Sequence, residues 1–374
     1  MTATYDVVIV GAGIVGSACG AACARGGLKV LVLERDWISG GATGTCMGHV
    51  VAMDDSEAQF ALTTYSSRLW REMVDELPAG AECDPCGTIW VAADDEEMEA
   101  VEKKHDSYRR AGLETKVLDA AAMARAEPSL RSGLAGGLLV TEDVVVYPPV
   151  VARCLLDSAQ ADGAEIRTGT EVRSLRADGS VVLADGTMVS ARSVVNAAGC
   201  FSPSLTPDLP VRGRKGHLVI TDRYPGYIRH QLIELGYLKS AHAVQSDSVA
   251  MNIQPRKTGQ MLIGSSRQFD SEGTEVEFPI VDRMIRRAAQ YIPSLGRLSA
   301  IRVWTGHRGA TPDKLPLIGP SIHSDRIWLA TGHEGLGITT SLGTGRMLAD
   351  LLLGRTPEIP AEPYSPQRFA PGGD

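Results

Sequence analysis

The sequence has no surplus of positive charge and no long apolar run. Its 374 residues include 37 Lys and Arg against 45 Asp and Glu, which gives a net charge of -8. This balance lacks the basic footprint of a nucleic-acid-binding protein. No segment reaches the uninterrupted apolar length of a transmembrane helix, and the first residues lack the basic region of a signal peptide. We therefore expect a cytoplasmic protein without nucleic-acid partners.

Cysteines are few and scattered. The sequence has seven, an odd number that does not make a secreted disulfide framework. Cys83 and Cys86 form the one Cys-x-x-Cys pair, but a zinc site would need a second pair or nearby histidines at a matching spacing. We interpret the two thiols as reduced and structural, with a redox disulfide as the alternative and no metal site.

A glycine-rich segment, Gly11-Ala12-Gly13-Ile14-Val15-Gly16, lies between a short apolar run at 5–10 and an alanine-rich stretch. This order predicts a strand, a turn and a helix. Gly11 permits the tight turn, and Gly13 lets the backbone approach a pyrophosphate at the helix N-terminus. Gly16 lets the helix and the strand pack closely. The segment therefore predicts a dinucleotide site.

A second apolar run, 29–33, ends in Glu34. A carboxylate at this point accepts hydrogen bonds from the ribose hydroxyls of an adenosine and repels the extra phosphate of NADP. A second glycine segment, Gly332-His333-Glu334-Gly335-Leu336-Gly337-Ile338, lies near the other end of the chain. Because one such segment binds half of a dinucleotide, two of them suggest a flavin held end to end, with NAD as the alternative.

Nucleotide-type elements also occur in the middle of the chain. Residues 194–199 are typical of a buried strand that closes on small residues, which let a cofactor approach the backbone. Segments 211–220 and 250–266 are strand candidates suited to a broad antiparallel sheet. A simple NAD dehydrogenase keeps its dinucleotide fold in one block, so this order favours FAD. We expect an α/β fold in which a Rossmann-like FAD-binding domain is interleaved with an antiparallel-sheet α+β substrate domain.

Several motifs occur in an order that resembles the D-amino-acid oxidase superfamily of FAD enzymes. They are the N-terminal glycine segment, Ala197-Ala198-Gly199, 306–313 with 315–319, and Gly332-His333. The similarity covers nearly the whole chain. The bacterial D-hydroxyproline dehydrogenases look most similar, on the segments 47–56, 214–220 and 234–240. The FAD β-subunits of octopine, nopaline and L-proline dehydrogenases are also similar.

The resemblance implies an FAD-binding domain of the glutathione-reductase type, built from three stretches of chain. We expect this domain at 1–80, 148–210 and 306–374, and the substrate-binding domain at 81–147 and 211–305.

The resemblance also implies a noncovalent FAD. Sarcosine oxidase bonds its flavin to a cysteine at the position that is Gly306 here. Ala42-Thr43 and Met47-Gly48-His49 fall on the family's loop that wraps the flavin diphosphate and ring, and Val172 matches a backbone contact to the adenine. Residues 335–339 match a helix start whose N–H groups face the flavin O2 edge and stabilise the charge of the reduced ring. The expected FAD-binding residues are Gly11, Gly13, Ile14, Val15, Gly16, Glu34, Arg35, Ala42, Thr43, Met47, Gly48, His49, Val172, Ala198, Gly199, Gly335, Leu336, Gly337, Ile338 and Thr339.

Arg308 matches the arginine that pairs with the substrate carboxylate in glycine oxidase and its relatives. A planar guanidinium donates two parallel hydrogen bonds to a carboxylate and so fixes the direction of the Cα–H bond. A surface ion pair with Asp313 is the alternative. Asn252 stands where glycine oxidase has a substrate-facing tyrosine, and Gly309 stands where relatives often have proline. The residues that would hold a substrate hydroxyl or tune the flavin, unless they are structural, are His217, Tyr237, His307 and His333.

The resemblance implies an amino-acid dehydrogenase rather than an oxidase. Sarcosine oxidase has an oxygen-activating lysine on the strand matched by 260–264, and this segment has none. We expect hydride transfer from the substrate Cα to flavin N5 without an obligatory base. The best small amino- or imino-acid substrate would be cis-4-hydroxy-D-proline or D-proline.

Two alternatives stay open. One is an oxidase of glycine, sarcosine or D-amino acids, and the other is an electron-transfer or assembly subunit of a larger complex. The electron acceptor is expected to be a quinone, a dye or an iron–sulfur partner subunit. A homo-oligomer, a hetero-oligomer and membrane association through an acceptor partner are compatible with the sequence.

Overall fold

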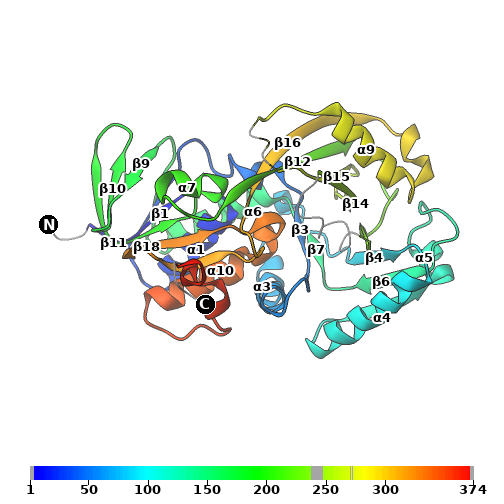
Figure 1. Cartoon of the computed structure of the whole chain (residues 1–374), viewed down its shortest axis with the longest axis horizontal. Coiled ribbons are helices and arrows are strands. Elements are labelled where there is room, and N and C mark those ends of the chain that lie inside the picture. The colour runs from blue at the N-terminus through cyan, green and yellow to red at the C-terminus, as the bar shows by residue number, and fades with distance from the viewer. Residues whose placement is uncertain (1–3, 237–246, 270, 272, 371–374) are drawn as a thin grey trace.

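The computed structural model describes residues 4–236, 247–269, 271 and 273–370. Figure 1 shows two lobes side by side, each built around one sheet, and the chain crosses between them repeatedly. The expected α/β fold class is confirmed.

The first sheet is parallel at its centre, as in a nucleotide-binding fold. Its order is β17-β18-β11-β1-β2-β8, with β10 paired to β11 and β9 paired to β10. β1 pairs in parallel with β2 and β11, and β17 is an antiparallel edge strand. The strands are β1 (Tyr5–Val10), β2 (Val30–Leu33), β8 (Glu165–Arg167), β9 (Val172–Leu175), β10 (Ser180–Leu183), β11 (Met188–Asn196), β17 (Leu317–Ser321) and β18 (Ser324–Thr331).

Four helices pack together beside this sheet. Helix α1 (Ile14–Arg25) contacts α6 (Pro148–Ala161) and α10 (Gly337–Leu352), and α3 (Glu57–Val74) packs on α10. The α1–α10 contact is close, because a Cβ at Gly345 would lie 2.6 Å from the Ala18 oxygen. Small residues therefore hold the two ends of the chain together.

The second sheet forms the other lobe, in the order β16-β12-β15-β14-β13-β4-β6-β5. All its pairs are antiparallel except β13 with β4, where Gln231 lies opposite Thr88. The expectation of an antiparallel sheet misses this one pair. The strands are β4 (Thr88–Ala92), β5 (Thr115–Asp119), β6 (Gly136–Val140), β12 (Arg212–Thr221), β13 (Gln231–Glu234), β14 (Ser248–Pro255), β15 (Met261–Arg267) and β16 (Ala300–Ala310).

Helices pack on both faces of this sheet, and short elements join the lobes. Helix α9 packs on β14 and β15 and α5 packs on β5 and β6 at one face, whereas α4 packs on β5 and β6 at the other face, where Trp90 lies. The remaining elements are α2 (Ala42–Thr45), α4 (Asp95–Arg110), α5 (Ala120–Ala126), α7 (Ser202–Leu205), α9 (Phe278–Ala289), β3 (His49–Val50), β7 (Val144–Val145), and the 3-10 helices η1 (Ala79–Ala81), η2 (Gly199–Phe201), η3 (Pro293–Arg297), η4 (Glu334–Leu336), η5 (Glu362–Tyr364) and η6 (Pro366–Phe369).

The chain limits of the two domains stay a prediction. The first sheet takes its strands from the beginning, the middle and the end of the chain, whereas the strands of the second sheet come from the stretches between them. Strand β16 runs through the expected limit at 306.

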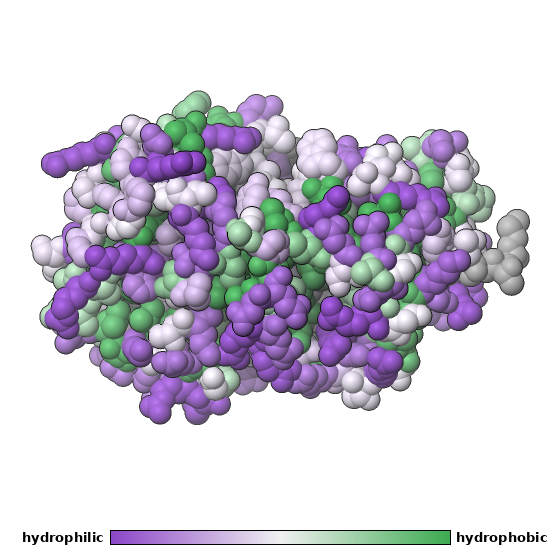
Figure 2. Space-filling view, turned by 180° about the vertical axis from the view of Figure 1, so that it is seen from behind, coloured by the Kyte–Doolittle hydropathy of each residue, from purple (hydrophilic) through white to green (hydrophobic). Residues whose placement is uncertain are grey.

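The surface is mostly hydrophilic. On the face shown in Figure 2, hydrophobic side chains gather toward the middle of the molecule and hydrophilic ones surround them. Over the ranges that the structure describes, no helix combines the length and the apolar character needed to cross a membrane. Cys83 and Cys86 are free thiols, and burial raises the pKa of Cys86 to about 12.

Candidate active site

The turn after β1 leaves the N-terminus of α1 free to bind an anion. Gly11 has a left-handed φ of +108°, and a Cβ there would lie 2.7 Å from the Ala197 oxygen, so glycine is required. At Gly16 a Cβ would overlap the Gly11 oxygen. Helix α1 has no acidic residue in its first turn and no side-chain cap from Gly13. Its positive dipole end therefore fits a phosphate group.

The two glycine segments meet although they lie at opposite ends of the chain. A Cβ at Gly337, the first residue of α10, would lie 4.0 Å from Val15 Cγ2 and 3.5 Å from His333 Cβ. Helix α10 has no acidic residue in its first turn and no side-chain cap. Two helix N-termini thus converge on one region between the lobes, which suits an extended anionic cofactor.

Glu34, at the end of β2, stabilises the first glycine turn by hydrogen bonds. Its Oε2 accepts a hydrogen bond from the Ala12 N–H at 2.7 Å, and its Oε1 accepts one from the Asp36 N–H at 3.1 Å. Arg35 pairs with Asp36 at 3.0 Å and lies 5.1 Å from the ring centre of Phe201. Each Glu34 oxygen keeps capacity for a further donor, as an adenosine ribose would supply.

The other residues expected near the adenosine and the flavin also lie at strand ends of the first sheet. Val172 is buried at the start of β9. The Ala198 N–H donates to Asn196 Oδ1 at 3.2 Å, and the Gly199 oxygen accepts a hydrogen bond from Thr331 Oγ1 at 3.0 Å. These bonds hold the end of β11 against β18 beside the first glycine turn.

Ser39 is a residue that the sequence analysis missed. It has a left-handed φ of 67°, its N–H donates to the Ala12 oxygen at 3.1 Å, and its side chain is buried. Its Oγ has no hydrogen-bond partner within the described chain. A buried hydroxyl beside the α1 turn fits a bound phosphate oxygen. The Ser39-Gly40-Gly41 run was the available signal.

Residues 42–49 connect the two lobes. Thr43 Oγ1 accepts a hydrogen bond from the Ile14 N–H at 3.0 Å, and the Gly48 N–H donates to Gln254 Oε1 at 2.9 Å. A Cβ at Gly48 would overlap the Val146 oxygen. His49 is half-buried, and its Nδ1 has no partner among the described residues. Burial and the nearby Arg308 charge lower the pKa of His49 to about 4.

Arg308 lies on β16 opposite Arg214, and its guanidinium reaches over Gly216 of β12. Its Nη1 donates to the Ser266 oxygen at 3.1 Å, and a Cβ at Gly216 would lie 2.8 Å from its guanidinium nitrogens. The glycine therefore leaves room for the guanidinium on this face of the sheet. Asp313, the alternative partner considered from the sequence, pairs instead with Arg368 at 2.6 Å.

A small cavity of about 50 Å³ lies where β4, β13 and β14 meet the start of η4. It brings together Asn252, His333, His49, Gly335 and Leu336 from the residues expected at the site. Its lining is completed by Val51, Met53, Asp55, Gln59, Trp90, Ile233, Arg267, Lys314 and Glu334. Arg308 lies next to this lining, since its Nη1 donates to the oxygen of Ser266, the residue that precedes Arg267.

Three polar side chains of this cavity are neutral or lie against opposite charge. Asn252 Oδ1 accepts from Gln231 Nε2 at 3.2 Å. His333 Nε2 and Thr344 Oγ1 are 3.0 Å apart, and burial lowers the pKa of His333 to about 3, so this ring is neutral at pH 7. Glu334, with a left-handed φ of 48°, forms a close ion pair with Arg214 and lies 3.6 Å from Arg267.

The structure does not bring all predicted side chains to the cavity. The ring nitrogens of His217 contact Ser266 Oγ at 3.1 Å and the Glu277 N–H at 3.0 Å, and His217 does not line the cavity. The His307 Nε2 is 2.9 Å from the Ser271 oxygen. Tyr237 lies outside the described residues. Trp90, Arg267 and Glu334 were missed as cavity residues because the sheet register and the η4 turn, rather than a sequence motif, bring them together.

A Rossmann-type sheet with two converging glycine segments, beside a sheet that carries an arginine near a cavity, is typical of an FAD-dependent oxidoreductase. The comparison with protein families agrees. The chain belongs to the DAO family of FAD dependent oxidoreductases, whose profile matches residues 6–351.

Similar proteins include both oxidases and dehydrogenases. The chain is 29% identical to a glycine oxidase of Pseudomonas aeruginosa, over 96% of this chain and 98% of that protein. It is 28% identical to a D-amino acid dehydrogenase of Xanthobacter autotrophicus, over 83% of this chain and 73% of that protein. The crystal structure of L-proline dehydrogenase from P. horikoshii has the same fold, with a TM-score of 0.88, 23% identity, and coverage of 99% of this chain and 98% of that one.

Proposed function

We propose that this family member is a dehydrogenase of secondary-amine acids, with cis-4-hydroxy-D-proline or D-proline as its best substrate. The observation that carries the proposal is Arg308, whose guanidinium lies against Gly216 and donates to the Ser266 oxygen, beside Arg267 of the cavity wall. A carboxylate bound there would be held by a planar cation whose position the sheet fixes.

The chain's own residues would bind and orient a neutral amine. Arg308 would hold the carboxylate, Asn252 would offer its amide to a substrate hydroxyl, and His333 would stay neutral because of its low pKa. An amine that binds neutral needs no general base. When bound, FAD takes up the hydrogen and two electrons that leave the substrate Cα, and the product is an imine.

FAD would be held without a covalent bond. Gly306 carries no side chain that could form one, and Thr45 lies so close that a Cβ at 306 would overlap its Oγ1. We expect acid precipitation of the yellow holoenzyme to release all of the flavin as FAD. Flavin that stays with the pellet would contradict this assignment.

The test of the function is a substrate panel with a dye as acceptor. Imino acids, D-amino acids, glycine, sarcosine and amines without a carboxylate are compared by kcat/KM. We expect cis-4-hydroxy-D-proline or D-proline to be best and the amines without a carboxylate to be poor. A preference for simple amines would overturn the proposal.

A glycine oxidase is the second candidate, supported by the similarity to the Pseudomonas aeruginosa enzyme. The segment at 260–264 favours a dehydrogenase, because no lysine there supplies a positive charge for oxygen reduction. Reoxidation of the substrate-reduced protein in air, followed by stopped flow, separates the two candidates. Peroxide release at the rate of turnover with glycine would favour the oxidase.

A further inference from the structure

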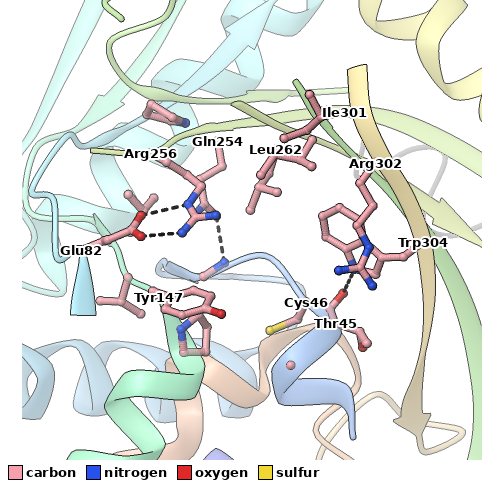
Figure 3. A pocket seen from close by; sticks show the side chains of 17 residues that line it. Thr45, Cys46, Glu82, Tyr147, Gln254, Arg256, Leu262, Ile301, Arg302 and Trp304 are labelled. Carbon is pink, nitrogen blue, oxygen red and sulfur yellow. Dashed lines mark hydrogen bonds and ion pairs between the residues drawn. The ribbon is translucent and has the colours of Figure 1, made fainter. Parts of the chain in front are cut away.

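A second and larger cavity, of about 280 Å³, lies near the candidate active site (Figure 3). We call it the outer pocket. Its mouth includes Tyr147 and Ile301, whose residue surfaces are 40% and 57% exposed. It shares no lining residue with the small cavity. The lining residues used below are Cys46, Gly48, Ile220, Gln254, Leu262 and Trp304, with Glu82, Tyr147, Arg256 and Arg302 nearer the mouth.

The two cavities lie on the same face of the second sheet. Alternate residues of a strand point to one face, and β14 places Asn252 in the small cavity and Gln254 in the outer pocket. On β16, Trp304 of the outer pocket and Arg308 are likewise an even number of residues apart. The substrate side and the outer pocket are therefore neighbours along one surface.

The segment predicted to wrap the flavin separates the two cavities. Cβ atoms at Gly306 and Gly264 would contact Thr45 and Met47, so this segment crosses the face of the sheet at these two glycines. The segment borders the outer pocket at Cys46 and Gly48 and the small cavity at His49.

The wall of the outer pocket suits a flat, conjugated molecule. Ile220 and Leu262 form an apolar floor, and Trp304 is fixed by its indole N–H, which donates to the Thr45 oxygen at 3.0 Å. Figure 3 shows the Trp304 and Tyr147 rings on opposite sides of the space. Aromatic rings bind flat conjugated molecules by offset stacking.

The charges at the mouth favour carbonyl oxygens over a cation. Arg256 lies 5.0 Å from the Tyr147 ring centre and is neutralised by Glu82, at 2.9 and 2.5 Å. Arg302 lies 5.5 Å from the Trp304 ring centre, and over the described ranges no carboxylate pairs with it. Glu82 is the one acidic residue in the described lining. The rim therefore carries an excess of positive charge.

We propose that the outer pocket binds a quinone as the electron acceptor of this enzyme. The inference rests on the proposed dehydrogenase function. The balance is simple: the amine loses two hydrogens from its Cα–H and N–H bonds to give the imine, and the quinone gains two electrons and two protons to give the hydroquinone. Electrons enter from the small cavity and leave through the outer pocket, so substrate and acceptor do not compete for one site.

The experiment measures acceptor binding without turnover. The oxidised holoenzyme is titrated with menadione, a flat naphthoquinone, by calorimetry and in the absence of any amino acid. Leu262→Trp fills the pocket floor, and we expect it to weaken menadione binding by at least about tenfold. Arg302→Ala, a milder change at the rim, should weaken binding by about threefold to tenfold. Arg286→Ala, a surface arginine of helix α9 paired with Asp282, is the matched control and should bind as the wild type does.

A second readout separates the two half-reactions. In anaerobic stopped flow, the reduction of Leu262→Trp by the amino acid should match that of the wild type, whereas its reoxidation by menadione should slow at least about tenfold. Should Leu262→Trp fail to retain FAD, Arg302→Ala gives the answer alone. The proposal would be overturned if menadione did not bind to the wild type, or if menadione and the amino acid competed. It would also be overturned if Arg302→Ala and a folded Leu262→Trp both bound menadione as the wild type does. If no amino acid reduces the protein, the proposed function fails, while the titration still reports on the pocket.

Discussion

Gly11 and Gly16 in the first lobe and Gly216 in the second sheet exclude a side chain for different reasons. In the first lobe, a Cβ at Gly16 would overlap the Gly11 backbone oxygen, and one at Gly11 would lie 2.7 Å from the Ala197 oxygen. On the face of the second sheet, a Cβ at Gly216 would instead meet the end of the long Arg308 side chain. The backbone cannot move aside without breaking the sheet, but a side chain can change rotamer.

This difference separates folding from function. A substitution at Gly11 or Gly16 should cost stability and FAD, because the backbone near the added atom cannot yield. A substitution at Gly216 should leave the fold intact and displace the Arg308 guanidinium. Glycine therefore secures the nucleotide fold in one lobe and the position of a guanidinium in the other.

The largest effect is expected at Gly16. Gly16→Ala places a methyl group onto the Gly11 oxygen at the turn that opens α1, so we expect a loss of at least about 3 kcal/mol of unfolding free energy and most of the bound FAD. Gly296→Ala is the matched control, because nothing lies within 4 Å of its added Cβ. Thermal melting and the flavin absorbance of the purified proteins measure both effects. A yellow Gly16→Ala protein with wild-type stability would remove the contrast between the lobes.

The next effect is expected at Arg308. Arg308→Ala removes the carboxylate partner, and a charge-assisted hydrogen bond is worth about 1.5–3 kcal/mol, so kcat/KM should fall by roughly tenfold to a hundredfold. Arg308→Lys keeps the charge but loses the planar fork, and should recover only part of this activity. FAD content should stay normal in both. An unchanged kcat/KM of Arg308→Ala on hydroxyproline would refute the assignment.

The comparison is sharpened at Gly216. Gly216→Ala puts a methyl group where the Arg308 guanidinium lies, at 2.8 Å, and the guanidinium can move aside. We expect normal melting and FAD content, with kcat/KM reduced about threefold to tenfold through a weaker hold on the carboxylate. Gly213→Ala, on the same strand, meets only an ordinary 3.6 Å contact with His307 and should be neutral. If Gly216→Ala instead unfolds the protein, this sheet is as rigid as the first lobe.

The two lobes also differ in how far the sequence alone could predict them. The first glycine turn is local: strand, turn, helix and Glu34 follow one another within the first residues of the chain, so their chemistry could be assigned from order and residue type. The fold class could be predicted for the same reason. The parallel pairing of β13 with β4 could not, since it depends on the path of the chain through the whole sheet.

The small cavity is lined by residues that lie far apart in the sequence. Trp90, Asn252 and Glu334 come from β4, β14 and η4, and only the sheet register makes them neighbours. A histidine is equally ambiguous in sequence: His217 and His333 were equal candidates, yet His217 is bonded to Ser266 and Glu277 while His333 lines the cavity. Burial and partners decide such a case, and neither follows from residue type.

The smallest effect is expected where the two lobes meet, at His333. Burial lowers its folded pKa to about 3, whereas an unfolded histidine has a pKa of about 6.5. Between these values the unfolded chain binds more protons than the folded one, so the stabilising contribution is complete above about pH 6.5 and is lost as the pH falls toward 3. No inflection from this ring is expected in the activity above about pH 6.5.

The measurement is the melting temperature of the oxidised holoenzyme, in excess FAD, from about pH 7 to about pH 5. Wild-type melting should fall over this range, and it should fall less in His333→Gln, because an amide that still reaches Thr344 does not titrate. His323→Gln, at an exposed position, is the matched control and should keep the wild-type slope. Equal slopes in wild type and His333→Gln would mean that burial does not lower the pKa of His333, and the neutral ring assigned to the cavity below about pH 6.5 would then be wrong. A reduced slope leaves His333 as a neutral imidazole in a cavity whose Glu334 carboxylate faces Arg214 and Arg267, so that the cations Arg308, Arg267 and Lys314 supply the positive charge that a substrate carboxylate meets.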